Sequence, residues 1–219
     1  MNKLFRKDLR LCTNAQLIVS VALSALMLIP SFPGAAPFIY AITGIATVFP
    51  RLLANRDLEY SMILPIRQKD LVRSKVLFCV FYELLAMVVG AIFAVPRLLV
   101  IEPYVASQGG EITSFLSPTI AVFGFGLLGA GIANLILFPI YFRNPFKKMT
   151  APPLLAILAY VVVAAVSTLL SAYVPAFASY DQTGIIVQCS TLCVGAVAFL
   201  LITWLSMRIS IKRFAKIDL

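Results

Sequence analysis

Residues 55–75 read NRDLEYSMILPIRQKDLVRSK, a charged stretch between two long apolar runs. It carries basic and acidic side chains side by side: Arg56, Arg67, Lys69, Arg73 and Lys75 with Asp57, Glu59 and Asp70. So polar a segment is too costly to lie in lipid, so it marks where the chain leaves the membrane. We call residues 54–75 the 54–75 loop.

The composition is that of an integral membrane protein. Of the 219 residues, 61% are hydrophobic and only 12% are charged, with a mean hydropathy of +0.98. Soluble domains average about 45–50% apolar and about 25% charged residues. The net charge of +9 comes from basic residues at the ends of apolar runs, which indicates membrane orientation and not a nucleic-acid partner. We therefore predict an all-α fold, with residues 1–219 forming a single transmembrane domain.

Residues 2–12 predict a short amphipathic helix in the membrane interface, with basic residues on one side and apolar residues on the other. Asp8 falls on the apolar side. It is either an interfacial acid, exposed or partly paired, or the partner of a cation in a cytosolic loop.

Six apolar runs follow, each near the length of about 20 residues that a helix needs to cross a bilayer. The predicted spans are 15–32, 35–53, 76–101, 115–140, 152–174 and 185–207.

Charge fixes the expected orientation. With the N-terminus inside, 17 of the 18 basic residues fall on the cytosolic side, and only Arg97 falls outside. This bias is typical of cytoplasmic loops, so both termini and the 54–75 loop are expected in the cytoplasm. Arg97 is predicted to extend its guanidinium to the outer headgroups.

Enzyme chemistry finds little support in the sequence. The chain has no His, and no Gly-x-x-x-x-Gly-Lys-Ser/Thr phosphate loop. We predict no catalytic residue and no metal site. Cys189 and Cys193 are four residues apart, a spacing that leaves soft-metal binding as an alternative to two ordinary apolar cysteines.

Two polar residues inside the spans are candidates for a translocation path. Glu83 lies eight residues into the third apolar run, where a carboxylate is costly unless it is paired, protonated or facing water. The alternative is a structural, hydrogen-bonded Glu83. Asn134 continues a stripe with Gly126 and Ala130, which predicts close helix packing, either within the chain or in a dimer.

The 54–75 loop is too long for a simple connection. Arg56–Met62 favours one or two helical turns, Pro65 interrupts them, and residues 68–75 can begin the next helix with Asp70 near its positive end. Such an elbow is a docking surface for a soluble partner. The alternative is a solvated loop that only supplies positive charge.

Three motifs carry a family resemblance: RDLEYSMILPIRQKDLVRSK (56–75), MNKLFRKDLRL (1–11) and LILFPIYFRNPFKKM (135–149). Together they resemble the coupling segment, the interfacial helix and the boundary after the fourth span in small six-span permeases of the type-2 ABC transporter (ABC-2) family. One departure is the short connection between the fifth and sixth spans, where larger relatives have outer helices.

The resemblance implies an exporter permease in a bacterial cell membrane. It would pair with a second permease copy, as a homodimer or a heterodimer, and with separate ATP-binding subunits that hold ATP and Mg²⁺. No cofactor is expected in this chain. The coupling helix would fall on Arg56, Asp57, Leu58, Glu59, Tyr60, Ser61 and Met62.

The expected cargo is hydrophobic or amphipathic, a peptide, lipid or drug, with amphipathic peptides preferred by resemblance. The alternative function is a non-transporting scaffold or sensor that binds another soluble protein through the 54–75 loop. An ATP-independent carrier would be expected to show an internal repeat, and residues 1–109 and 110–219 do not resemble each other.

Overall fold

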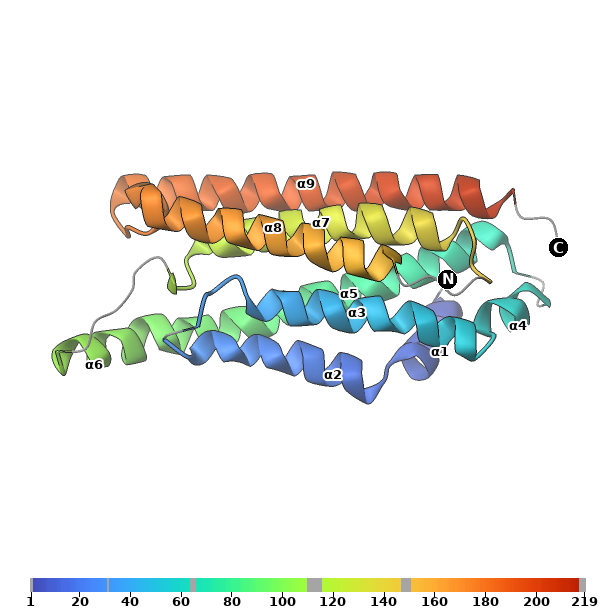
Figure 1. Ribbon diagram of the computed structural model, residues 1–219, viewed down its shortest axis with the longest axis horizontal. Helices are drawn as coiled ribbons and strands as arrows, with labels where there is room; N and C mark the ends of the chain where they lie inside the picture. Colours follow the sequence, from blue (N-terminus) through green and yellow to red (C-terminus); the bar gives the residue numbers. More distant parts are fainter. Residues whose placement is uncertain (1, 31, 64–65, 110–115, 147–150, 217–219) are drawn as a thin grey trace.

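The computed structural model describes residues 2–30, 32–63, 66–109, 116–146 and 151–216. All regular secondary structure in this part of the chain is helical. Long helices lie side by side in an elongated bundle (Figure 1). The predicted all-α membrane fold is confirmed at this level.

The short helix α4 (Asp57–Ile63) lies at one end of the bundle, which we call the α4 end. Helix α1 (Asn2–Cys12) and the C-terminal part of α9 (Gln182–Phe214) lie at the same end (Figure 1). Helix α6 (Glu102–Ser107) lies at the other end, the α6 end. The helix predicted at Arg56–Met62 is therefore present, shifted by one residue.

Within the described residues, five helical segments are long and apolar enough to cross a membrane. They correspond to the second to sixth predicted spans: α3 (Pro37–Ala54), the continuous segment Gln68–Ser107, α7 (Ile120–Tyr141), α8 (Ala151–Tyr173) and α9 (Gln182–Phe214). A short 3-10 turn, η4 (Pro175–Phe177), connects α8 to α9.

The first predicted span, 15–32, is shorter than expected. It comprises α2 (Ala15–Ala22) and the 3-10 helix η1 (Leu23–Leu28), with 8 and 6 residues. At about 1.5 and 2.0 Å per residue these reach only ~24 Å, less than the ~30 Å bilayer core. Ile29, just before Pro30, is extended with ψ 121°, as a proline demands of the residue before it. A sixth span exists only if α1 is joined to α2 across an 87° bend, so the six-span count is not confirmed.

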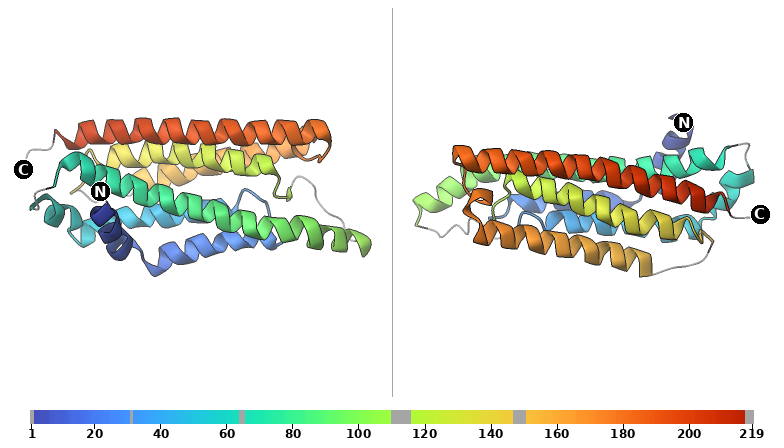
Figure 2. Two further views of the ribbon diagram at one scale, coloured as in Figure 1. Left: turned by 180° about the vertical axis from the view of Figure 1, so that it is seen from behind. Right: turned by 90° about the horizontal axis from the view of Figure 1, so that it is seen from above.

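The third span is longer than 76–101. Helix α5 (Gln68–Pro96) continues through a π-helical turn, η2 (Arg97–Ile101), into α6, giving 40 helical residues. The turn follows Pro96, which cannot donate the usual backbone hydrogen bond. The helix therefore continues past residue 101, the predicted end of the span, as far as Ser107. Figure 2 shows α5 running along the bundle between α2 and α3 on one side and α7 and α9 on the other.

Small residues bring α7 and α9 together. A Cβ on Gly124 would lie 2.6 Å from the backbone oxygen of Thr191, and a Cβ on Gly195 would clash with the backbone of Gly124. Only glycine permits this approach of two backbones. Gly126 instead faces Phe38, Met87 and Tyr160 of the same chain. The stripe therefore packs within the chain, and its reading as a dimer contact is wrong.

Candidate functional site

The candidate site is the junction of α4, α1 and α5 at the α4 end. Residue Arg56 turns the chain from α3 into α4 with a left-handed φ of 50°, a conformation that costs a non-glycine residue about 1–2 kcal/mol. Such strain persists only where surrounding contacts hold the segment in place. Here the contacts come from a network of charged side chains.

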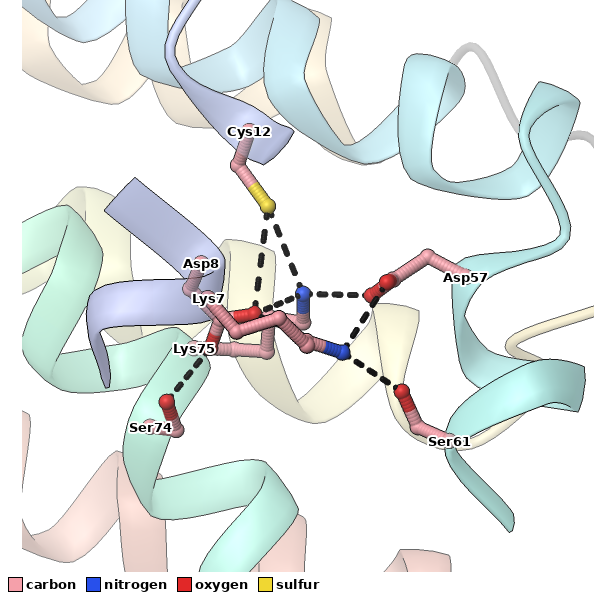
Figure 3. A network of polar contacts seen from close by, with 7 residues as sticks. All are labelled: Lys7, Asp8, Cys12, Asp57, Ser61, Ser74 and Lys75. Atoms are coloured by element: carbon pink, nitrogen blue, oxygen red, sulfur yellow. Dashed lines mark hydrogen bonds and ion pairs between the residues drawn. The ribbon is translucent and has the colours of Figure 1, made fainter. Parts of the chain in front are cut away.

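Lys75 is the centre of this network. Its ammonium lies 2.6 Å from Asp8 of α1 and 2.6 Å from Asp57 of α4 (Figure 3). Lys75 also contacts the thiol of Cys12 at 3.4 Å. The side chains of Lys75 and Asp8 are only 2% and 0% exposed. One buried cation thus joins the consecutive helices α4 and α5 to α1, which is distant in the sequence.

Lys7 closes the network from the other side. It donates to Asp57 Oδ1 at 3.0 Å and to Ser61 Oγ at 2.7 Å. The hydroxyl of Ser74 donates to the second oxygen of Asp8 (Figure 3). Two carboxylates thus face two ammonium groups, and formal charge balances.

The balance of charge has an energetic consequence. A buried ion pair is often no better than an apolar pair, but removing one partner strands the other charge at a cost of about 3–5 kcal/mol. Burial alone would raise the pKa of Asp57. The ammonium groups of Lys75 and Lys7 outweigh that effect and hold its pKa below the ordinary value. Asp57 is therefore a carboxylate at neutral pH.

The network decides between the two interpretations of Asp8. The carboxyl group is fully buried and ion-paired with Lys75, so the exposed interfacial acid is wrong. Its partner, Lys75, is the last residue of the 54–75 loop and lies in the first turns of α5. Sequence reasoning did not single out Lys7, Cys12 or Ser74. The available signal was one acid on the apolar side of an amphipathic helix, together with a lysine at the start of an apolar run.

The predicted coupling residues divide between two faces of α4. Asp57 and Ser61 point into the network, and Leu58 is buried at 2% exposure. Tyr60 points outward and is 74% exposed. Arg56 is exposed as well. The side chains of Glu59 and Met62 lie outside the described part of the structure.

A pocket of about 590 Å³ lies where α4 meets α1 and the end of α3. Side chains from α1, α3, α4 and the intervening turn line it: Lys7, Leu11, Leu52, Asn55, Asp57, Tyr60 and Ser61. The α4 end therefore offers a concave surface next to an exposed tyrosine, a shape suited to contact with another protein.

A second polar cluster lies within the bundle. Glu83 is 2% exposed, and its Oε2 accepts a hydrogen bond of 2.9 Å from Asn134. Asn134 also lies 3.4 Å from the hydroxyl of Thr203, and its backbone oxygen accepts from Ser206. The two predicted path residues thus meet between packed helices.

Part of this cluster is left without hydrogen bonds. Glu83 Oε1 and the hydroxyl of Tyr160 are buried, and neither has a partner within the described residues. Both residues line a cavity of about 10 Å³, close to the least volume that holds one water molecule.

Arg97 corrects one prediction. It is fully buried at the α6 end and does not extend to lipid headgroups. Its guanidinium bonds Glu102 at 2.9 Å and donates to four backbone oxygens, those of Met27, Pro30, Phe32 and Leu116. The carbonyls of Met27, Pro30 and Phe32 are available because η1 and the segment near Pro30 leave regular α-helix, whereas Leu116 lies before α7.

Cys189 and Cys193, the two cysteines considered for soft-metal binding, lie in the half of α9 near the α6 end. Cys189 and Cys193 are exposed free thiols. Within the described ranges, no three His, Cys, Asp or Glu side chains come together in a way that could hold a metal ion.

A helical bundle with several membrane-length helices is typical of a polytopic membrane protein. Comparison with known families narrows this class. A family described as ABC-2 family transporter protein matches residues 3–215, so the chain belongs to that family. Neither a curated protein nor a solved structure matched the chain. Family membership makes the chain a multi-pass permease subunit that works with an ATP-binding subunit.

Proposed function

We propose that the chain is the permease of an ATP-driven exporter, and that α4 is its coupling helix. The observation that carries the proposal is the buried network of Lys7, Asp8, Asp57 and Lys75, which fixes α4 to α1 and α5. A helix held in this way can transmit force, whereas a solvated loop would dissipate it.

The α4 end would face the cytoplasm. Of the basic residues that the structure describes, Arg97 lies at the α6 end and the others gather toward the α4 end, as the positive-inside rule requires of a cytoplasmic face. Both termini would then be cytoplasmic, in a bacterial cell membrane.

The two faces of α4 would have different roles. Tyr60 and Arg56 would contact the ATP-binding subunit, together with Glu59 and Met62 by family resemblance. Asp57, Leu58 and Ser61 would act as positioning residues, because their side chains are directed into the protein.

Closure of two ATP-binding subunits would move α4, and the network would pass that motion to α5. Helix α5 extends through 29 residues, so displacement at its first turns reaches the middle of the membrane. There it would alter the contact of Glu83 with Asn134 and open a path at the interface with a second permease copy. Alternating access of this kind needs no catalytic residue in the permease.

The cargo would be hydrophobic or amphipathic, with amphipathic peptides preferred. The support is the scarcity of charge along the spans: among the described residues 76–96 of α5 and in α7 and α8, Glu83 is the sole charged residue. A strongly charged cargo would find few partners there.

The test compares two exposed tyrosines at opposite ends of the bundle. Tyr60 is 74% exposed and Tyr104, in α6, is 65% exposed. We expect Tyr60→Asp to reduce co-purification of a co-expressed candidate ATP-binding subunit by about tenfold, equivalent to ~1.4 kcal/mol. Tyr104→Asp should leave it unchanged.

Two results would contradict the proposal. If Tyr60→Asp and Tyr104→Asp bound the ATP-binding subunit equally well, α4 would not be part of the contact. Capture of a soluble protein without an ATP-binding motif, lost in Tyr60→Asp, would instead support the scaffold function.

A further inference from the structure

A second pocket at the α4 end lies apart from the network. It measures about 380 Å³ and is lined by Arg143, Asn144, Arg213 and Lys216. The first two residues follow the end of α7, and the last two belong to the end of α9 and the residues just after it. Three cations and one amide thus line a pocket in which the described side chains include no acid.

Contacts between the helices fix the form of this pocket. Arg213 Nη1 donates to the backbone oxygen of Pro139 at 2.9 Å, and Ser206 of α9 donates to the backbone oxygen of Asn134 at 2.7 Å. The first contact holds the end of α9 against the end of α7, and the second joins the same two helices further inside the bundle. The pocket is therefore part of the packed structure, and its basic side chains start from fixed backbone positions.

Helix α7 sets the depth of the pocket in the membrane. Its 22 residues span ~33 Å at about 1.5 Å per residue, which nearly equals the ~30 Å hydrocarbon core. Residues directly after Tyr141 therefore lie at the level of the lipid headgroups. Arg213 bonds Pro139, so the end of α9 lies at the same level.

The charges in this pocket differ from those of the network. Lys75 and Lys7 are neutralised by Asp8 and Asp57. Arg143 and Lys216 make no ion pair within the described residues, and both are exposed. A guanidinium bonds two phosphate oxygens at once, and a nearby ammonium adds a third donor. Basic pockets between membrane helices on the cytoplasmic side suit anionic lipid headgroups.

We propose that Arg143, Asn144, Arg213 and Lys216 bind the phosphate of an anionic phospholipid headgroup. The site goes beyond the proposed transport function and does not depend on it. A membrane phospholipid is favoured over an acidic protein surface because of the headgroup depth and the fixed, pocket-shaped arrangement.

The experiment measures lipid binding to purified, delipidated protein by native mass spectrometry, with phosphatidylglycerol and phosphatidylcholine as probes. The test variant is Arg143→Gln/Lys216→Gln, which leaves the Arg213–Pro139 contact in place. The matched control is Lys69→Gln/Lys212→Gln, which removes two exposed cations elsewhere. Lys212 lies on α9 itself and outside the pocket.

We expect phosphatidylglycerol to bind the native chain and the control equally, and to bind the test variant about 30-fold more weakly, the combined effect of two cations near the membrane surface. Phosphatidylcholine should bind the native chain, the test variant and the control variant with similar affinity. Arg143→Lys/Lys216→Arg keeps both charges and should restore binding. The melting temperature of each variant in phosphatidylcholine shows whether any loss comes from unfolding.

The proposal would be overturned if the test and control variants lost phosphatidylglycerol binding equally, or if the native chain bound the two lipids equally. It would also be overturned if millimolar inorganic phosphate displaced phosphatidylglycerol, because a free anion would then be the preferred ligand. A fourth result would also overturn it: the Arg143→Gln/Lys216→Gln variant no longer co-purifies with the ATP-binding subunit but still binds phosphatidylglycerol. That result would assign the pocket to a protein partner.

Discussion

Lys75 and Arg97 are both buried cations of the same helical segment, at opposite ends of the bundle, and they are satisfied in different ways. Lys75 pairs with two carboxylates from α1 and α4. Arg97 pairs with one carboxylate and donates to four backbone oxygens. The α4 end is thus held by charged side chains on separate helices, and the α6 end by one side chain that binds irregular backbone.

This difference separates a junction that can move from one that holds the fold. Ion pairs between helices can shift together if the charges stay matched. Hydrogen bonds to four carbonyls from separate segments require one geometry. We therefore expect substitutions at the α6 end to affect folding, and substitutions at the α4 end to affect both folding and coupling.

The largest effect is expected for Arg97→Leu. The change leaves the charge of Glu102 unpaired and removes the side-chain donor from the backbone oxygens of Met27, Pro30 and Phe32, so the free energy of unfolding should fall by about 4–5 kcal/mol. Arg97→Lys should recover little, since an ammonium lacks the planar fork of a guanidinium. Denaturant unfolding in detergent measures both. Arg208→Gln, an exposed change, is the control, and an equal loss in the control would contradict the assignment.

Lys75→Met should have the next largest effect and lower the free energy of unfolding by about 3 kcal/mol, because Asp8 and Asp57 would lose their shared cation. Adding Asp8→Asn should restore part of that stability, since one stranded charge is removed. The double-mutant cycle measures the coupling directly. Additive losses would show that Lys75 and Asp8 do not act as a pair.

Glu83 lies between the two ends of the bundle. Glu83→Gln should change the free energy of unfolding by no more than about 0.5 kcal/mol, because the amide oxygen still accepts a hydrogen bond from Asn134. Glu83→Leu should cost about 1–3 kcal/mol by stranding Asn134. Transport measured on Glu83→Gln separates the remaining roles. Native transport with native stability would make Glu83 a structural residue.

The smallest effect concerns pH. The folded-state pKa of Asp57 is depressed by the neighbouring lysines, so its contribution is present above the ordinary pKa of about 3.9 and is lost as pH falls through the lower folded-state value. The difference in melting temperature between the native chain and Asp57→Asn should thus stay constant from pH 7 to about 5 and shrink below about pH 4. A difference that is constant to pH 3 would contradict the ion pair.

Much of the fold could be predicted from hydropathy and charge, because long apolar runs and loop charges obey simple rules in a membrane. The failures had local causes. Pro30 and the tightening to a 3-10 helix shortened the first span, and the π-helical turn after Pro96 carried the third span onward to Ser107.

The candidate site was only partly predictable. A helix at Arg56–Met62 follows from composition, but the face it presents depends on partners 50 or more residues earlier in the chain, such as Lys7 for Asp57. Arg97 was predicted to extend to the outer headgroups because a cation at the end of a span usually does so. No sequence pattern predicts which backbone carbonyls will lack a hydrogen-bond partner.

The central claim is that the outward face of α4 contacts an ATP-binding subunit. Cross-linking in native membrane vesicles tests it most directly, with one exposed cysteine introduced at Tyr60→Cys or, as the matched control, at Tyr104→Cys. Both are made in a Cys189→Ser/Cys193→Ser background, since those two thiols are exposed. We predict a cross-link to the ATP-binding subunit from position 60 and none from position 104. A cross-link from position 104 alone, or equal cross-linking from both, would contradict the account.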